Sequence, residues 1–345
     1  MRGNMTIQIK IIRTDLELEC PHLDKALRDT GANLVLLSDD ISEDDLMAQT
    51  CDADLILMCY TPITAKVIAN AKRLKGIVKF GVGIDAIDID AARTHKIPVV
   101  NIPEYAENTV AEGAFTLMIA LAKKLVPIHN AMQNKGWVWP TERWIGSDIS
   151  GKTVGLVGVG KIGKSMARMA GAGFGADVVG YNPNMSAEVM HAAGVEKYDD
   201  LRDMLAVCDF VSVHCVLNDN TRHLIGADEL RAMKPTAILV NVSRGAIIDE
   251  VALVQALKNG TIAGVGLDVY SNEPLNNKDH PMRELYDMDN VILSPHLTFY
   301  TGEAMQRLED ETFERCMEVL DGHPVTVKSK DPRLTAQESG IIFET

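Results

Sequence analysis

Short apolar runs alternate with longer amphipathic stretches along most of the chain. In the first part of the chain, the apolar runs cover residues 7–12, 34–37, 54–59, 76–80 and 98–102. Each run is nearly continuous, which is typical of parallel strands that are buried on both faces. Strands that alternate with helical patterns predict a parallel α/β sheet. We therefore expect these runs to form one doubly wound unit.

The stretches between the runs have the start and stop residues of helices. The stretch 21–31 has a proline at its first turn and a glycine at its end, and the stretch 64–76 begins with Thr64 as N-cap and ends with a glycine. A longer helix is expected from Glu107 to 126. Because this stretch is apolar almost all round, we expect it to be buried against a domain or a partner.

A second α/β unit begins at Gly151. Its apolar runs cover residues 153–157, 210–215, 237–243, 263–269 and 290–294. A chain of 345 residues is also long enough for two domains of ordinary size. The pattern therefore predicts an α/β protein with two doubly wound parallel-sheet domains.

The first strand of the second unit leads into a glycine-rich turn. Gly158, Gly160 and Gly163 form the pattern G-x-G-x-x-G between this strand and a helical stretch. Glycines at these positions permit a tight turn, close approach of a pyrophosphate and close packing of the helix on the strand. The N-terminal amides of the helix then hold the anion. Such a pattern alone is weak, but between a strand and a helix it predicts a dinucleotide-binding site.

The next strand ends at Asn182, where dinucleotide-binding sites usually have an acid that accepts a hydrogen bond from the ribose 2′-hydroxyl. An amide still bonds the diol but carries no charge to repel a 2′-phosphate. No arginine lies in the following turn to attract one. We expect NAD as the cofactor, with NADP as the open alternative.

Polar residues follow the last strands of the second unit. Arg244, Asp268, Glu273 and His296 each come shortly after a predicted strand. Open α/β sheets bind ligands at the carboxyl ends of their strands. An arginine, a carboxylate and a histidine there predict proton and hydride chemistry on an anionic substrate. Taken alone, three of these residues also have a structural interpretation: Arg244 as a helix cap, Glu273 as a solvated loop acid and His296 as a histidine bonded to the backbone.

Composition excludes several other classes of protein. The net charge is −14 and no basic stripe offsets it, so nucleic-acid binding is not expected. The longest apolar runs are too short to span a membrane, and the first residues lack the features of a secretion signal. We expect a cytoplasmic protein. The six cysteines form no C-x-x-C pair, so we expect them to be reduced, buried and structural, and we expect no metal site.

From about residue 50 to about residue 323, the chain resembles the D-isomer-specific 2-hydroxyacid dehydrogenase family. The resemblance rests on the motifs FGVGIDAIDI, PEYAENTVAEGAFTLMIALAKKL, GKTVGLVGVGKIG, VHCVLNDNTRHLIG, LVNVSRGAIIDEVALVQAL, GLDVYSNEP and SPH. Arg244, Glu273 and His296 also stand in the order and spacing of the family's catalytic trio. Among its members, the chain is similar to phosphoglycerate dehydrogenases without their regulatory domain.

The resemblance implies a domain organisation. A flavodoxin-like substrate domain would comprise residues 1–103 and 297–345, and a Rossmann NAD-binding domain would comprise residues 104–296, with a cleft between the two. Residues 130–150, which include the tryptophan-rich segment 136–144, match the family's dimer arm. The expected assembly is a homodimer.

The resemblance also implies roles for single residues. Arg244 would clamp the carboxylate and carbonyl of a small 2-oxo acid. His296 would serve as the acid/base, and Glu273 would orient the imidazole and stabilise its protonated form. Asp268 would hold the carboxamide of the nicotinamide. The expected reaction is hydride transfer between NAD(H) and a 2-hydroxy or 2-oxo acid of D configuration.

Further binding residues follow from the same resemblance. The main-chain amides of Val82 and Gly83 would receive the substrate carboxylate. Lys79 would either meet a second acidic group or support this loop. The expected substrate contacts are Tyr60, Lys79, Val82, Gly83 and Arg244, and the expected cofactor contacts are Thr109, Gly158, Gly160, Lys161, Ile162, Gly163, Asn182, Cys215, Val216, Thr221, Val242, Ser243, Asp268 and His296.

Two alternatives and some departures from the family pattern remain. Formate dehydrogenases have glutamine where Glu273 stands, which argues against that activity. The C-terminal-binding-protein corepressors share the scaffold and resemble the aromatic pair Phe299 and Tyr300, so an NAD(H)-sensing binding protein stays open. Val216 and Asn218 stand where relatives often have proline and threonine. The aromatic pair either packs the next helix or walls the substrate pocket.

Overall fold

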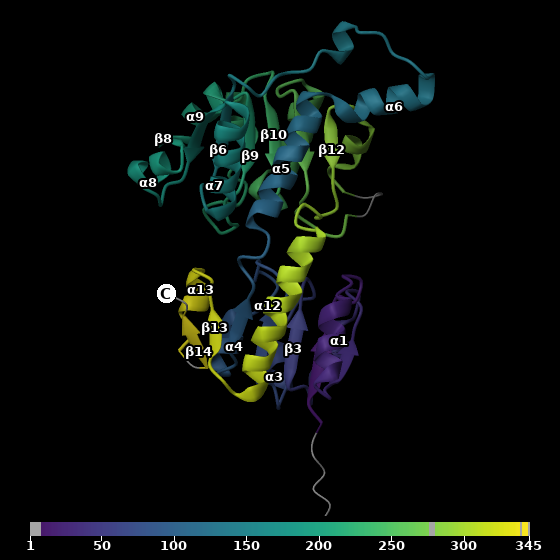
Figure 1. Ribbon diagram of the computed structural model, residues 1–345, viewed down its shortest axis with the longest axis vertical. Coiled ribbons are helices and arrows are strands. Elements are labelled where there is room, and N and C mark those ends of the chain that lie inside the picture. Colours follow the sequence, from purple (N-terminus) through teal and green to yellow (C-terminus); the bar gives the residue numbers. More distant parts are fainter. Residues whose placement is uncertain (1–7, 276–279, 339, 344–345) are drawn as a thin grey trace, which may run out of the picture. The chain divides into compact units, whose positions relative to one another are not determined.

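The computed structural model describes residues 8–275, 280–338 and 340–343. The chain divides into two compact units, one formed by Met1–Ala106 with Thr301–Thr345 and the other by Glu107–Tyr300 (Figure 1). The sequence placed these boundaries at 103 and 297. Residue 7 of the first expected strand lies outside the described residues.

The first unit is built on a parallel sheet with the strand order β2-β1-β3-β4-β5. Its strands are β1 (Lys10–Arg13), β2 (Asn33–Leu36), β3 (Leu55–Met58), β4 (Gly76–Lys79) and β5 (Val99–Asn101). All residues of β3, β4 and β5 are buried, which explains why they appear as continuous apolar runs. This order is that of flavodoxin-like folds, as expected.

Helices cover the sheet of the first unit, and the C-terminal segment adds to it. Its helices are α1 (Pro21–Asp29), α2 (Glu43–Thr50), α3 (Ala65–Asn70), α4 (Ile89–Thr94), α12 (Gly302–Asp321) and α13 (Pro332–Thr335). The long α12 packs against α1, β3 and β4 (Figure 1). Two short parallel strands, β13 (Val325–Val327) and β14 (Ile341–Phe343), follow. Gln337 bonds both main-chain groups of Val99, at 2.7 and 2.9 Å, and so ties this segment to β5.

The helix expected over 64–76 is shorter than the sequence suggested. Thr64 caps it through the main-chain N–H of Val67, as predicted, but α3 ends at Asn70. The N–H of Lys72 then donates to the carbonyl of Cys51, at 3.2 Å, which draws the chain away from the helical path. Gly76 is therefore not a helix C-cap but the first residue of β4.

The second unit is built on a larger parallel sheet with the order β12-β11-β10-β9-β6-β7-β8. Its strands are β6 (Thr153–Val157), β7 (Asp177–Tyr181), β8 (Glu196–Tyr198), β9 (Phe210–Val213), β10 (Ile238–Asn241), β11 (Gly264–Leu267) and β12 (Val291–Leu293). The order reverses between β6 and β9. In doubly wound sheets, ligands bind outside the carboxyl ends of the strands at such a switch point. The expected fold class of two doubly wound parallel α/β domains is confirmed.

The helical elements of this unit lie on both faces of its sheet. They are α5 (Glu107–Ala122), α6 (Leu125–Lys135), α7 (Lys161–Arg168), α8 (Ala187–Ala192), α9 (Leu201–Val207), α10 (Ala227–Ala232) and α11 (Glu250–Lys258), with the short turns η1 (Glu142–Trp144), η2 (Met169–Gly173), η3 (Gly245–Ile247) and η4 (Arg283–Asp287). In Figure 1, α6 and the segment after it extend away from the sheet of their own unit. Of the helices in the described ranges, none has both the length and the apolar character needed to cross a membrane.

The single helix expected from Glu107 to 126 is two helices. α5 is largely buried, as predicted, but it ends at Ala122. Lys124 adopts a left-handed conformation with φ 51° and redirects the chain into α6. Pro127 lies in the first turn of α6, where a missing N–H is tolerated, whereas it would interrupt a continuous helix.

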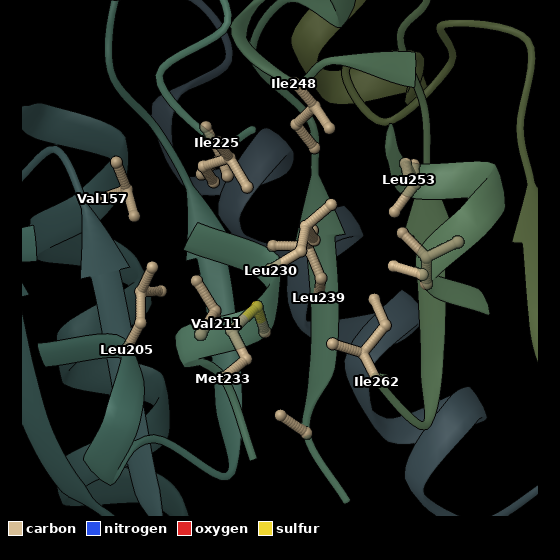
Figure 2. Packing of buried hydrophobic residues seen from close by; sticks show 14 of the residues in the cluster. Val157, Leu205, Val211, Ile225, Leu230, Met233, Leu239, Ile248, Leu253 and Ile262 are labelled. Atoms are coloured by element: carbon tan, nitrogen blue, oxygen red, sulfur yellow. The ribbon is translucent and has the colours of Figure 1, made fainter. Parts of the chain in front are cut away.

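The core of the second unit lies on both faces of its sheet. On one face, side chains from β6, β9 and β10 meet those of α9, α10 and α11, and Figure 2 shows Val211, Leu230 and Leu239 in this cluster. On the other face, α5 and α7 cover the sheet. Burying one such Leu or Val side chain contributes about 1.5–3 kcal/mol. The packing holds the carboxyl ends of β6, β9, β10, β11 and β12 at one edge.

Candidate active site

The turn after β6 has the geometry of a diphosphate cradle. Gly158 has φ 95°, and a Cβ there would lie 2.6 Å from the main-chain nitrogen of Cys215. A Cβ on Gly163 would lie 2.5 Å from the carbonyl oxygen of Gly158, whereas the space beside Gly160 is open. α7 begins at Lys161 with Gly160 as N-cap, so no side chain caps its first N–H groups. These groups fit an anionic phosphate.

Several other residues expected to bind a cofactor lie in the loops that follow β9 and β10. The hydroxyl of Ser243 donates to the carbonyl of Cys215, and the hydroxyl of Thr221 donates to that of Val216 at 2.6 Å. These bonds tie together the loops that follow β9 and β10. Val216 is exposed, Ile162 and Thr221 are half-buried, and Thr109 and Val242 are buried.

Asn182 follows directly after β7. The N–H of Gly158 donates to the carbonyl of Tyr181 at 2.9 Å, so Asn182 lies beside the glycine turn. Its side-chain oxygen accepts a hydrogen bond from the N–H of Asn184 at 3.1 Å. The position thus holds a neutral amide within a local turn, in the place expected from the sequence.

His214 is a residue of this region that the sequence did not single out. The residue as a whole is half-buried, but its two ring nitrogens are inaccessible to solvent and have no hydrogen-bond partner among the residues that the structure describes. Burial lowers the pKa of His214 from 6.5 to about 4. The imidazole is therefore neutral at physiological pH. In the sequence, His214 is a polar residue within the apolar run 210–215, and nothing there shows that its ring is buried.

His296 and Glu273 form a close pair beyond the carboxyl ends of β12 and β11. The distance from His296 Nδ1 to Glu273 Oε2 is 2.7 Å, and the side chains are 26% and 27% exposed. The other carboxylate oxygen of Glu273 accepts from the main-chain N–H of Tyr270 at 2.8 Å. Both carboxylate oxygens of Glu273 are thus fixed, one by His296 Nδ1 and one by the main-chain N–H of Tyr270.

Opposing effects act on the charge of Glu273. Burial raises its pKa, but the hydrogen bond from His296, the charge of His296, the N–H of Tyr270 and the charge of Arg244 lower it. The pKa of Glu273 lies below its ordinary value as a result. The carboxylate of Glu273 is therefore ionised at neutral pH.

Arg244 lies in a loop that the end of β10 holds in place. The amide of Asn241 donates to the carbonyl of Arg244 at 2.9 Å, and its oxygen accepts from the N–H of Ser243 at 3.0 Å. A Cβ on Gly245 would overlap the main chain of Tyr270, so the loop lies directly against the segment that leads to Glu273. The structure thus brings all three residues of the expected trio into one unit.

Asp268 is fully buried at the end of β11. Its carboxylate accepts hydrogen bonds from the main-chain N–H groups of Leu297 and Thr298, at 2.8 and 3.0 Å. It also accepts one from the hydroxyl of Thr298, at 2.5 Å. Asp268 therefore contacts the two residues that follow His296.

The substrate residues expected in the first unit lie at the carboxyl edge of its own sheet. Tyr60 and Val82 are 44% and 45% exposed, and Gly83 is half-buried. The amide of Asn101 donates to the carbonyl of Val82 at 2.6 Å, which fixes this loop.

Lys79 is buried beneath the same loop. Its ammonium donates to the carbonyl oxygens of Cys59 and Phe80 and to the sulfur of Cys59, and it lies 5.3 Å from the centre of the Tyr60 ring. These contacts use all three of its donors. The sequence did not single out Asp15, whose carboxylate accepts from the N–H of Cys59 at 2.8 Å and fixes the same segment.

The aromatic pair after His296 divides into one buried and one partly exposed ring. Phe299 is buried and meets the His296 ring edge to face, with 6.2 Å between centroids. Tyr300 is 44% exposed and contacts Phe299. Packing therefore accounts for Phe299.

The cysteines were expected to be reduced, buried and structural. All six cysteines are free, as expected, and four are buried, but Cys215 is half-buried and Cys51 is exposed because it caps the surface helix α2. In the described ranges, no group of His, Cys, Asp or Glu side chains could hold a metal ion.

The glycine turn at the switch point of a parallel sheet defines a dinucleotide-binding α/β protein. Residues 115–298 match the family described as D-isomer specific 2-hydroxyacid dehydrogenase, NAD binding domain. The chain belongs to the D-isomer specific 2-hydroxyacid dehydrogenase family, as its sequence motifs suggested. It is an oxidoreductase with a nicotinamide cofactor.

Relatives with an assigned activity are similar over most of this chain. It is 38% identical over 299 residues to D-3-phosphoglycerate dehydrogenase of Methanocaldococcus jannaschii, covering 86% of this chain and 55% of that protein. It is 36% identical over 283 residues to glyoxylate reductase of Thermococcus litoralis, covering 80% and 83%. The chain thus spans about half the length of the phosphoglycerate dehydrogenases it matches.

Solved structures with different cofactors are similar in fold. D-lactate dehydrogenase from Aquifex aeolicus, complexed with NAD and lactic acid, has a TM-score of 0.80 and 28% identity, covering 90% of this chain and 96% of that one. An acyclic imino acid reductase in complex with NADPH and D-Arg has a TM-score of 0.79 and 28% identity, covering 92% and 98%.

Proposed function

We propose that this protein transfers hydride between NAD(H) and a small 2-hydroxy or 2-oxo acid of D configuration. The observation that carries the proposal is the His296–Glu273 pair, 2.7 Å apart, in the same unit as the glycine turn. Arg244 lies close enough for its charge to lower the pKa of Glu273. In this combination, His296 is the proton donor, Glu273 is the anion that pairs with it, and Arg244 is the cation that binds an acidic substrate.

His296 acts as the acid in reduction and as the base in oxidation. Nδ1 is bonded to Glu273, so Nε2 donates the proton to the carbonyl oxygen of the 2-oxo acid. A nicotinamide cofactor held at the glycine turn would supply the hydride for the carbonyl carbon. One hydride and one proton convert the 2-oxo acid to the 2-hydroxy acid, and the oxidation reverses both transfers.

Arg244 is proposed to bind the acidic end of the substrate. The planar guanidinium of Arg244 holds the carboxylate and the carbonyl oxygen together, which orients and polarises the carbonyl. The main-chain N–H groups of Val82 and Gly83 receive the carboxylate. Lys79 supports this loop, since its three donors are used by Cys59 and Phe80. Tyr60 and Tyr300 are the exposed aromatic residues proposed to limit the substrate's size.

NAD is the proposed cofactor. The turn from Gly158 to Gly163 and the start of α7 would hold its diphosphate, and Asn182 would bond the ribose diol. The buried Thr109 and Val242 and the loops that carry Cys215, Ser243 and Thr221 would line its site.

The assay that tests this proposal is a panel of 2-oxo acids, run with NADH and with NADPH. We expect oxidation of NADH by at least one of glyoxylate, pyruvate, hydroxypyruvate and larger analogues, at a higher kcat/KM than with NADPH. A higher kcat/KM with NADPH would contradict the choice of NAD. Binding of NADH without turnover of any 2-oxo acid would favour a sensing role instead.

We also propose that the protein is a cytoplasmic homodimer. Trp137 and Trp139 are 63% and 75% exposed, and α6 has no buried residue in the single chain. Contiguous exposed aromatics of this kind mark protein interfaces. Six free thiols are consistent with a reducing compartment.

A further inference from the structure

His296 has an unusual backbone conformation. Its φ is 58°, in the left-handed region that residues other than glycine rarely adopt. A residue stays in such a conformation only where the surrounding contacts determine it. The segment before His296 is already fixed, since the hydroxyl of Tyr270 donates to the carbonyl of Ser294 at 2.9 Å and Pro295, which directly precedes His296, restricts the chain.

The segment after His296 is held by a single buried carboxylate. Asp268 accepts from the N–H of Leu297 at 2.8 Å, and from the N–H and hydroxyl of Thr298 at 3.0 and 2.5 Å. Its own N–H donates to the carbonyl of Asn241 at 3.0 Å, so it is anchored to β10. An ionised carboxylate has acceptor sites for all three donors, and such charge-assisted bonds are strong.

A glycine of α5 lies against the same segment. A Cβ on Gly113 would lie 2.6 Å from Cβ and 3.1 Å from Cα of Thr298, and neither atom is the end of a flexible side chain. Glycine is unfavourable inside a helix. Its presence here leaves room for Thr298 to approach the helix.

We propose that Asp268, Thr298 and Gly113 form a brace that holds His296 in its left-handed conformation and so aims the imidazole. In this brace, Asp268 is a positioning residue that acts through the main chain of residues 297–298. Glu273 fixes the rotation of the ring, and the brace fixes the backbone that carries it. This inference rests on the proposed role of His296 as the acid/base.

Thr298 and Gly113 allow a test that leaves the groups expected to contact cofactor and substrate unchanged. Thr298→Val keeps the shape of the side chain but removes the hydroxyl that bonds Asp268. Gly113→Ala pushes Thr298 away from α5. Thr298→Ser keeps the hydroxyl and serves as the conservative variant. Thr116→Ala, at an exposed position of the same helix, serves as the control for changes in α5.

We expect Thr298→Val and Gly113→Ala to lower kcat for the best 2-oxo acid by ~10-fold or more, because small displacements of a reacting group cost this much. The Kd for NADH, measured by fluorescence titration, should stay within about twofold in both variants, since the brace acts after binding. Thr298→Ser should retain most of the activity, and Thr116→Ala all of it. A loss of kcat and NADH binding together would indicate general damage to the fold and would overturn the brace.

Crystal structures of the two variants give a readout that does not depend on activity. The His296–Glu273 distance, 2.7 Å here, should lengthen or the φ of His296 should change. An unchanged pair with an unchanged kcat would overturn the brace. If the wild-type protein turned over no 2-oxo acid, the proposed function would fail, and the variant structures would still decide whether the brace sets the position of His296. If Gly113→Ala did not fold, Thr298→Val would carry the test alone.

Discussion

Single residues decide the chemistry at the edge of the second sheet. His296 and Glu273 could be paired from the sequence because each follows a strand and because their spacing resembles that of a known family. The hydrogen-bond partners of Tyr270 and Asp268 could not be predicted, since these bonds join main-chain N–H groups to side-chain carboxylates in loops that no periodicity describes. A histidine's burial is equally invisible in the sequence, as His214 shows.

His214 makes the stability of the protein depend on pH. Its pKa is lowered from 6.5 to about 4, so the unfolded state binds the proton more readily than the folded state. The contribution of His214 is therefore fully present above pH 6.5 and is lost as the pH falls to about 4. The loss amounts to about 3 kcal/mol.

We expect His214→Leu to reduce this part of the pH dependence. Urea unfolding of both proteins at neutral pH and at mildly acidic pH measures it, as the difference in the free energy of unfolding. The wild-type protein should lose more stability than the variant on acidification. Equal losses in the two proteins would show that the His214 imidazole is not desolvated as the structure indicates.

At the scale of elements, the buried strands were predictable, whereas the short strands β8, β13 and β14 and the C-terminal ends of two helices were not. Buried parallel strands require continuous apolar runs, so each predicted strand overlaps a real one. The ends of α3 and α5 depend instead on tertiary contacts and on one left-handed residue, Lys124. In the sequence, Gly76 resembled a helix C-cap. In the structure it lies in β4, where α12 packs against it.

Gly76 is required by the packing of α12. A Cβ at this position would lie 2.8 and 3.0 Å from the two methyl groups of Val319, and 3.3 Å from the carbonyl oxygen of Pro98. We expect Gly76→Ala to lower the free energy of unfolding by about 1–3 kcal/mol through overpacking. Thermal unfolding measures the effect.

Two further variants test the cause. In a protein that already has Val319→Ala, Gly76→Ala should lower the free energy of unfolding by less than it does in the wild-type protein, because the clashing methyl groups are gone. Gly302→Ala, where nothing lies within 4 Å of the added Cβ, should be close to neutral. A loss in Gly302→Ala as large as that in Gly76→Ala would contradict the packing argument.

At the scale of the whole molecule, the two α/β units follow from the alternation of strands and helices. The proposed assembly of two copies does not follow from this alternation, because it would depend on the surface around Trp137 and Trp139. We expect a dimer in sedimentation velocity at micromolar concentration. Trp137→Ser with Trp139→Ser should shift it toward monomer, whereas Phe343→Ser, another exposed aromatic, should not. A monomeric wild-type protein would rule out the proposed interface.

The most direct test of the central claim compares the wild-type protein with His296→Ala in the oxidation of NADH by 2-oxo acids. We predict turnover by the wild-type protein and a fall in kcat of ~10²–10⁴ in the variant, because a positioned acid/base contributes this much. NADH should still bind to His296→Ala. Equal activity of the two proteins would contradict the assignment of His296 as the acid/base.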